Sequence, residues 1–216
     1  MDYSKVTRDL PDLVNMKGQF ESKFGGSIKY TSEYLVASAP GRVNLIGEHT
    51  DYSEGFVFPC GLSRRVGMVL KARSDSVIRV WAMDINQLGQ ADLKTAALER
   101  KSEMPGFLQF GCGVGVQLRD ALSPGTPIYG FDAVLSSTIP IGGGVSSSSA
   151  LAVATGSALR AINPAIQKQL SWSKFFNCIC EGEWQWSGVR GGIMDQYTSL
   201  NAEQDYAFVL DCRKFF

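Results

Sequence analysis

A glycine- and serine-rich stretch at residues 140–151 constrains the fold more than any other part of the chain. It follows a strand-like run at 131–137 and precedes an Ala/Leu-rich helical run at 151–159. A strand, a tight turn and a helix start therefore meet at one point. Glycines permit positive φ angles, and the first turn of a helix has N–H groups without intrahelical partners. This arrangement favours binding of an anion such as a phosphate group.

Two alternatives apply to this stretch. It lacks the Gly-Lys-Ser/Thr ending of the Walker A pattern, so a phosphate site here is of another type. A flexible Ser/Gly-rich turn is the second alternative. The position between two ordered elements, rather than in a polar linker, favours the phosphate site.

Composition describes a globular chain and excludes several function classes. The 216 residues carry 21 Lys+Arg and 21 Asp+Glu, so no charge excess indicates nucleic acid or an anionic membrane as a partner. No apolar run approaches membrane-spanning length, and the first 25 residues lack the apolar core of a signal peptide. Five scattered cysteines without a CxxC pair predict reduced thiols and a cytoplasmic protein.

Hydrophobic periodicity predicts a mixed α+β fold, because strands and helices occur without strict βαβ alternation. Residues 84–104 are polar, and we expect an irregular surface excursion there. The expected strands are 34–38 (ending at Pro40-Gly41), 56–58, 65–71, 77–82, 131–137 and 206–210, and the expected helices are 4–24, 107–122, the run to 162, 164–186 and a short one after 191–192.

The densest polar cluster lies at residues 41–52, where charged and polar side chains alternate with the apolar residues Val43, Leu45 and Ile46. We expect a loop anchored by these apolar residues that presents carboxylates, an imidazole and a guanidinium into a cleft. Carboxylates accept hydrogen bonds in fixed directions, which suits the recognition of sugar hydroxyls. The alternative is an N-capping turn with a local salt bridge.

Glu183 falls on an apolar helix stripe. Trp172, Phe176, Ile179 and Glu183 are spaced four, three and four residues apart and share one face, whereas Glu181 does not. A buried carboxylate requires a cation or hydrogen-bond donors, and Mg²⁺ is one candidate. Alternatively, Glu183 bends out to water at the helix end.

Asp195 is expected in the first turn of a helix that follows Gly191-Gly192. A carboxylate there is able to hold or deprotonate a hydroxyl group. The alternative is a structural role, since Asp in a first turn interacts favourably with the helix dipole. A serine hydrolase is poorly supported, because the chain has no GxSxG motif and a single histidine, His49.

Three stretches together resemble the galactokinase branch of the GHMP kinase superfamily, which also includes homoserine, mevalonate and phosphomevalonate kinases. Residues 40–52 resemble the galactokinase signature, which we place within 39–52. Residues 140–150 resemble the phosphate-binding motif of the superfamily, and residues 192–196 resemble the segment with the catalytic aspartate. Their order and spacing also agree.

The resemblance implies an ATP-dependent sugar 1-kinase that uses Mg²⁺. It implies that Asp195 orients or deprotonates the anomeric hydroxyl, and that Arg42 stabilises Asp195 and the transferred phosphoryl group. Ser148 and Glu183 would be the magnesium ligands. The residues implied in sugar binding are Glu48, His49, Thr50, Asp51 and the Gly192 backbone, and those implied in ATP binding are Gly142, Gly143, Gly144, Val145, Ser146, Ser147 and Ser148.

The sequence also departs from the family pattern. Arg190-Gly191 stand where Pro-Cys is usual, Trp184 stands where a histidine is common, and Phe110 is the nearest candidate for an adenine-stacking aromatic residue. The family is about twice as long. We therefore expect residues 1–216 to be a GHMP kinase N-terminal domain, with a fold resembling ribosomal protein S5 domain 2 and with the C-terminal domain absent.

The remaining expectations concern substrate and partners. Galactose is the expected sugar, and galacturonate, arabinose and N-acetylgalactosamine are the alternatives. A non-catalytic sugar and nucleotide sensor is the rival function. We also expect self-association through the face that a second domain would cover.

Overall fold

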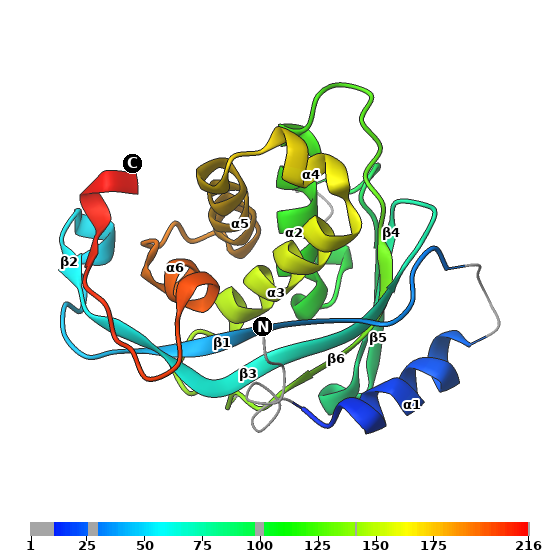
Figure 1. Cartoon of the computed structure of the whole chain (residues 1–216), viewed down its shortest axis with the longest axis horizontal. Coiled ribbons are helices and arrows are strands. Elements are labelled where there is room, and N and C mark those ends of the chain that lie inside the picture. Colours follow the sequence, from blue (N-terminus) through cyan, green and yellow to red (C-terminus); the bar gives the residue numbers. More distant parts are fainter. Residues whose placement is uncertain (1–10, 26–29, 98–101, 141, 216) are drawn as a thin grey trace.

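A five-stranded mixed sheet lies at the centre of the computed structural model, which describes residues 11–25, 30–97, 102–140 and 142–215 (Figure 1). The strand order is β1-β3-β6-β4-β5. Only the β4–β6 pair is parallel among these described strands; the other neighbours are antiparallel. The strands are β1 (Leu35–Asn44), β3 (Pro59–Ala72), β4 (Val77–Ala82), β5 (Gln87–Asp92) and β6 (Phe131–Ser137).

Helices cover both faces of this sheet. On one face, α2 (Gly106–Ala121), α3 (Ser147–Ile162) and α5 (Trp172–Ser187) enclose the main hydrophobic core (Figure 1). On the other face, α1 (Leu13–Phe24) packs Met16, Phe20 and Phe24 against the sheet. The α+β prediction is confirmed. The shorter elements are η3 (Asp51–Ser53), β2 (Phe56–Val57), η4 (Met83–Ile85), α4 (Pro164–Gln169), α6 (Met194–Asn201), β7 (Leu210–Asp211) and η6 (Cys212–Phe215).

Glycines in α2 and α5 bring these two helices into backbone contact. A Cβ at Gly113 would lie 2.4 Å from the carbonyl oxygen of Gly182, and a Cβ at Gly182 would lie 2.6 Å from Val114 Cα. The glycines that lower the helix propensity of α2 therefore allow α5 to approach it closely. This contact fixes the helix that carries Glu183.

Several elements differ from their predicted bounds. β1 continues through a bulge between Pro40 and Arg42 as far as Asn44, instead of ending at Pro40-Gly41. The expected helix 164–186 is two helices, because Ser171 caps α5 by accepting a hydrogen bond from the N–H of Lys174 at 3.2 Å. The expected surface excursion at 84–104 contains β5, which pairs with β4.

The ends of two predicted elements also move. The final strand is short: Leu210–Asp211 pair with β2, and Ala207 forms an isolated bridge with Cys60. The predicted helix at 4–24 begins at Leu13, where Asp12 provides the N-cap, and its first part at 4–10 lies outside the described residues.

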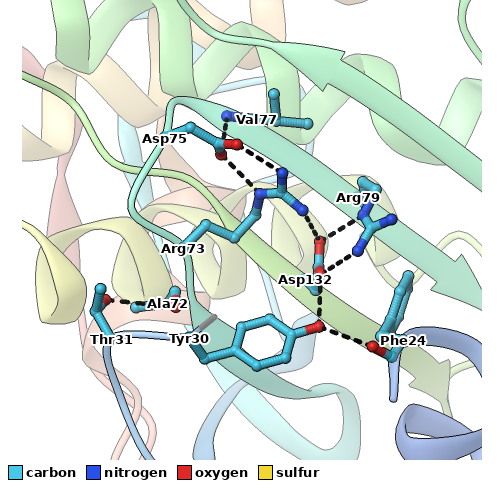
Figure 2. Close-up of polar contacts among 9 residues, drawn as sticks. All are labelled: Phe24, Tyr30, Thr31, Ala72, Arg73, Asp75, Val77, Arg79 and Asp132. Carbon is cyan, nitrogen blue, oxygen red and sulfur yellow. Dashed lines mark hydrogen bonds and ion pairs between the residues drawn. The ribbon is translucent and has the colours of Figure 1, made fainter. Parts of the chain in front are cut away.

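A buried charge network attaches the N-terminal helix to the sheet (Figure 2). Asp132 on β6 is fully buried and accepts hydrogen bonds from Arg73 Nη1 at 2.9 Å and from Arg79 Nε at 2.7 Å. Tyr30 donates its hydroxyl to Asp132 at 2.7 Å and also lies 3.3 Å from the carbonyl oxygen of Phe24, at the end of α1. Burial and the bond to Asp132 raise the pKa of Tyr30, so the hydroxyl remains a donor.

We predict that Asp132→Asn destabilises the protein strongly, because it leaves two largely buried arginines without their shared counter-charge. Breaking a buried ion pair from one side costs about 3–5 kcal/mol. Chemical denaturation followed by circular dichroism measures this loss. Asp75→Asn is the matched control, since Asp75 also pairs with Arg73 but its side chain is 50% exposed, and its expected cost is at most about 1 kcal/mol. Equal losses in the two variants would contradict a central role for Asp132.

Candidate active site

A cavity of about 370 Å³ opens where the end of β1, the start of α3, α5 and α6 meet. It brings together residues from sequence positions more than 150 apart. Residues predicted as functional from the sequence form much of its wall: Arg42, Asp51, Ser148, Glu183, Gly192 and Asp195.

The glycine turn is an ordered structure that packs on β1. Gly142, Gly144 and Ser146 have φ angles of 74°, 68° and 60°, so the turn depends on left-handed backbone. Arg42 donates its backbone N–H to the carbonyl of Val145 at 3.1 Å and its Nη1 to the carbonyl of Gly144 at 2.9 Å. These bonds hold the turn against the strand, and they argue against a flexible linker.

The start of α3 leaves donors at the cavity. α3 begins at Ser147, and the N–H groups of its first turn have no partners within the helix. Ser148 lies in the cavity wall, whereas 142–147 lie outside it. A side chain added at Gly142 or Gly144 would meet no protein atom within 4 Å, so the space beside both glycines is open.

The central interaction of the site is a two-pronged ion pair between Arg42 and Asp195. Arg42 Nε lies 2.6 Å from Asp195 Oδ1, and Nη2 lies 2.7 Å from Oδ2. Ser146 also donates its hydroxyl to Asp195 Oδ2. Paired hydrogen bonds of this kind fix the orientation of a carboxylate as well as its charge. Asp195 lies in the first turn of α6, as predicted.

Asp51 approaches the backbone of Gly192 so closely that only glycine fits there. A Cβ at Gly192 would lie 2.0 Å from Asp51 Oδ2. Asp51 is buried, and its Oδ1 accepts the N–H of Tyr52 at 2.9 Å. Burial raises the pKa of Asp51, and the negative charge of Asp195 raises it further, while the Tyr52 N–H and Arg42 oppose the shift.

Glu183 is buried and held by hydrogen-bond donors. Its side chain accepts Ser149 Oγ at 3.0 Å and Gln196 Nε2 at 2.8 Å. The residue is only 7% exposed, so the alternative in which it bends out to water is wrong. Burial raises the pKa of Glu183, and the hydrogen bonds from Gln196, Ser148 and Ser149 partly offset this rise. Within the described residues, no three His, Cys, Asp or Glu side chains form a metal-binding group.

Some predicted site residues lie apart from the cavity. Glu48 and His49 are exposed and are not part of its wall. His49 Nδ1 lies 2.5 Å from the hydroxyl of Tyr52, which does line the cavity. Thr50 contacts the carbonyl oxygens of Gly47 and Phe56 at 2.6 and 2.7 Å, and so closes the local turn.

The predicted burial of the apolar residues in this segment is wrong. Val43, Leu45 and Ile46 are 36%, 54% and 68% exposed and do not anchor the loop. The segment is held instead by backbone bonds, since the N–H of Leu45 donates to the carbonyl of Phe58 at 3.0 Å and the N–H of Phe58 donates to the carbonyl of Ile46 at 3.0 Å.

The sequence argument missed Ser149 and Gln196. Each directly follows a residue that was identified, Ser148 and Asp195, and each holds Glu183. A helix turns by about 100° per residue, so neighbours such as these serve different partners. The signal available was the buried position of Glu183, which required donors from some other helix.

Comparison with known proteins defines the class of protein. Residues 18–72 match the galactokinase galactose-binding signature, and residues 112–203 match the GHMP kinases N terminal domain. A mevalonate kinase structure from Methanococcus jannaschii shares this fold, with a TM-score of 0.64 at 18% identity over 85% of this chain and 55% of that one. The fold is that of a GHMP kinase N-terminal domain.

Within that class the chain belongs to the galactokinase family. It is 35% identical to a galactokinase of Chloroflexus aurantiacus and 32% identical to one of Glaesserella parasuis, in each case over 94% of this chain and 48% or 50% of the relative. The crystal structure of Lactococcus lactis galactokinase complexed with galactose superposes with a TM-score of 0.76 at 27% identity, covering 94% of this chain and 50% of that one. The chain thus spans about half the length of these relatives.

One further sequence expectation concerns membranes. Within the described ranges, none of the helices combines the length and the apolar character that crossing a bilayer requires.

We predict that Asp51→Asn raises the melting temperature at pH 7, because the native state holds a buried carboxylate that favours its protonated form. Protonation of Asp51 stabilises the folded state because the pKa of Asp51 is raised there. This stabilisation is complete below the ordinary pKa of 3.8 and is lost as the pH rises through the folded-state pKa. Each kcal/mol regained corresponds to about 2–4 °C for a domain of this size.

Thermal unfolding at pH 7 and at pH 3 measures this effect, and the gain at pH 7 should vanish at pH 3. Glu203→Gln, at an exposed carboxylate, is the control and should change little at either pH. A variant less stable than the wild type at pH 7 would show that Asp51 is not strained in its ionised form.

Proposed function

We propose that this chain is the sugar- and ATP-binding N-terminal part of a galactokinase, which transfers a phosphoryl group from ATP to the anomeric hydroxyl of galactose. The observation that carries this proposal is the shared cavity of Arg42, Asp195 and Asp51, next to an ordered glycine turn and the start of α3. Residues 1–216 together form the proposed domain.

In the proposed reaction, Asp195 accepts a hydrogen bond from the anomeric hydroxyl and directs its oxygen toward the terminal phosphorus of ATP. A bond forms between that oxygen and phosphorus, the bond from phosphorus to the leaving ADP oxygen breaks, and the hydroxyl proton is released. Arg42 holds Asp195 at 2.6 Å and contributes positive charge beside the transferred group. Phosphoryl transfer depends mainly on such positioning and charge neutralisation.

We assign the ATP phosphates to the turn 142–148 and the start of α3, where backbone N–H groups and the helix dipole favour anions. Glu183 and Ser148 are the proposed Mg²⁺ ligands. The fit rests on donor chemistry: a buried carboxylate whose present partners are neutral, next to a hydroxyl, matches the preference of Mg²⁺ for oxygen ligands. A bound Mg²⁺ would supply neutralisation of phosphate charge.

We assign the sugar to the side of the cavity formed by Asp51 and Gly192. A carboxylate that closely approaches a glycine backbone offers directed acceptors with little steric obstruction. Glu48, His49 and Thr50 remain proposed sugar-binding residues that lie outside the cavity wall of this structure. Galactose is the proposed substrate, ahead of galacturonate, arabinose and N-acetylgalactosamine.

A cytoplasmic location is part of this proposal. All five cysteines are unpaired, and burial raises the pKa of Cys112 to about 12 and of Cys178 to about 11. Thiols in this state fit a reducing compartment in which ATP is available.

We predict that Asp195→Asn abolishes turnover while ATP binding survives, because the variant loses the charged acceptor but keeps the turn. A coupled assay of ADP release with a panel of sugars measures turnover, and calorimetry measures ATP binding. Both are run on this chain and on this chain joined to the remaining half of the Chloroflexus aurantiacus relative. The loss in rate expected for a positioned acid–base group is at least about 100-fold.

Two outcomes would contradict the proposal. Wild-type rates in Asp195→Asn would remove Asp195 from its role. Binding of sugar and ATP without ADP release, in both the short and the joined forms, would support the non-catalytic sensor instead.

We further propose self-association of the 216-residue chain through an exposed apolar patch, defined as Val43, Leu45, Ile46 and Phe56. These side chains are 36–68% exposed. Val43 lies on β1, Phe56 on β2, and Leu45 and Ile46 in the segment after β1 that exchanges backbone hydrogen bonds with Phe58. Exposed apolar patches favour association.

We predict that Ile46→Lys shifts the chain toward monomer, because it places a charge in the proposed contact. Sedimentation equilibrium of the wild type should give a mass above that of one chain. Val14→Lys, at an 84% exposed position on α1, is the control and should leave the association unchanged. A monodisperse wild-type monomer at high concentration would exclude this proposal.

A further inference from the structure

The indole N–H of Trp184 is a buried donor without an acceptor. Trp184 follows Glu183 on α5, lines the cavity and is only 7% exposed. Its Nε1 has no hydrogen-bond partner in the part of the chain that the structure describes. Native structures rarely keep a buried polar group without a partner, because its lost hydration is then not replaced.

The space beside this donor is left open by a glycine. Gly191 also lines the cavity, and a Cβ built on it would meet a single atom within 4 Å, Trp184 Nε1 at 3.6 Å. No other protein atom outside the adjoining chain fills that position. A ligand atom is therefore able to sit next to the N–H, at the distance of about 2.9 Å that a hydrogen bond requires.

Gln196 provides a buried hydrogen-bond acceptor that has no donor among the described residues. It is 3% exposed and lines the same cavity. Its Nε2 donates to Glu183 Oε2 at 2.8 Å, so the amide nitrogen faces that carboxyl group and Oε1 is left for another partner. The remaining Oε1 has no partner among the described residues.

The Trp184 N–H and Gln196 Oε1 together select the chemistry of the ligand. A hydroxyl group both donates and accepts, so a polyhydroxylated molecule satisfies Trp184 and Gln196, whereas a fully ionised phosphate oxygen only accepts and satisfies Trp184 alone. Gly191 also adjoins Gly192, against which Asp51 lies on the proposed sugar side. Both observations favour a sugar hydroxyl over a phosphate oxygen.

We propose that Trp184 and Gln196 are specificity-determining residues for the monosaccharide, with Trp184 Nε1 donating to one hydroxyl oxygen and Gln196 Oε1 accepting a hydroxyl hydrogen. This inference rests on the proposed function and deepens it. It assigns the space at Gly191 to a sugar hydroxyl, and it gives Trp184 a role in substrate recognition.

Two substitutions test the donor independently. Trp184→Phe removes the N–H and retains an aromatic ring. Gly191→Ala keeps the N–H but fills the adjoining space, and the 3.6 Å separation is an ordinary contact that the fold tolerates. Calorimetry gives the Kd of galactose, and separately that of a non-hydrolysable ATP analogue, for each variant of the whole chain. Both variants should bind galactose about tenfold more weakly, as expected for the loss of one hydrogen bond, with nucleotide affinity unchanged.

Trp81→Phe is the matched control. The Nε1 of Trp81 is also buried and has no partner among the residues that the structure describes, but Trp81 packs with α1 on the opposite face of the sheet and does not line the cavity. Its loss should leave galactose affinity within about twofold of the wild type, because the lost group is remote from the site. Thermal unfolding of each variant identifies any that fails to fold, and Gly191→Ala then decides the donor.

Singly deoxygenated galactoses identify the hydroxyl. The wild type should bind one of them about tenfold more weakly than it binds galactose. Trp184→Phe should bind that deoxygenated sugar and galactose equally well, because the variant already lacks the hydrogen bond to the missing hydroxyl. Gln196→Met removes the acceptor at similar size, and it should weaken galactose binding about tenfold in the absence of metal and nucleotide.

The outcomes separate this inference from the proposed function. Galactose affinity unchanged in both Trp184→Phe and Gly191→Ala would overturn the inference and leave the kinase proposal standing. Weakened nucleotide affinity with unchanged sugar affinity would also overturn it, and would assign the donor to the nucleotide. A wild-type chain that binds none of the sugars would overturn both.

Discussion

The site depends on the pairing of Arg42 with Asp195. The two residues are 153 positions apart, and a third bond from Arg42 reaches the carbonyl of Gly144 at 2.9 Å. One side chain therefore connects β1, the glycine turn and α6. Because its guanidinium is planar and offers several donors in fixed directions, the arginine sets the orientation of all three elements at once. A lysine would provide charge without that geometry.

Around this pair the protein accumulates negative charge that it does not neutralise. Asp51, Glu183 and Asp195 all line the cavity, where Arg42 is the one arginine or lysine of the described wall. Burial raises the pKa of Asp51 and of Glu183, so both carboxylates are held in an environment that disfavours their charge. Such an arrangement favours the binding of hydroxyl donors and cations, and it is common at functional sites.

The sequence predicted those features that depend on local chemistry. The strand, glycine turn and helix at 131–162 and the first-turn position of Asp195 follow from turn residues and periodicity, and the structure confirms them. The exposure of Leu45 and Ile46 and the pairing of β5 with β4 depend on contacts distant in sequence, which no local pattern encodes. The roles of Ser149 and Gln196 were missed for the same reason, since each is defined by a carboxylate on another helix.

The backbone contact between Gly113 and Gly182 has a mechanical consequence. Where the main chains of two helices touch, the contact involves backbone atoms that cannot change rotamer, so α5 has little room to move along α2. Glu183 therefore belongs to a rigid pair of helices. Gln196 on α6 donates to Glu183 at 2.8 Å, so the start of α6 is attached to the same rigid body.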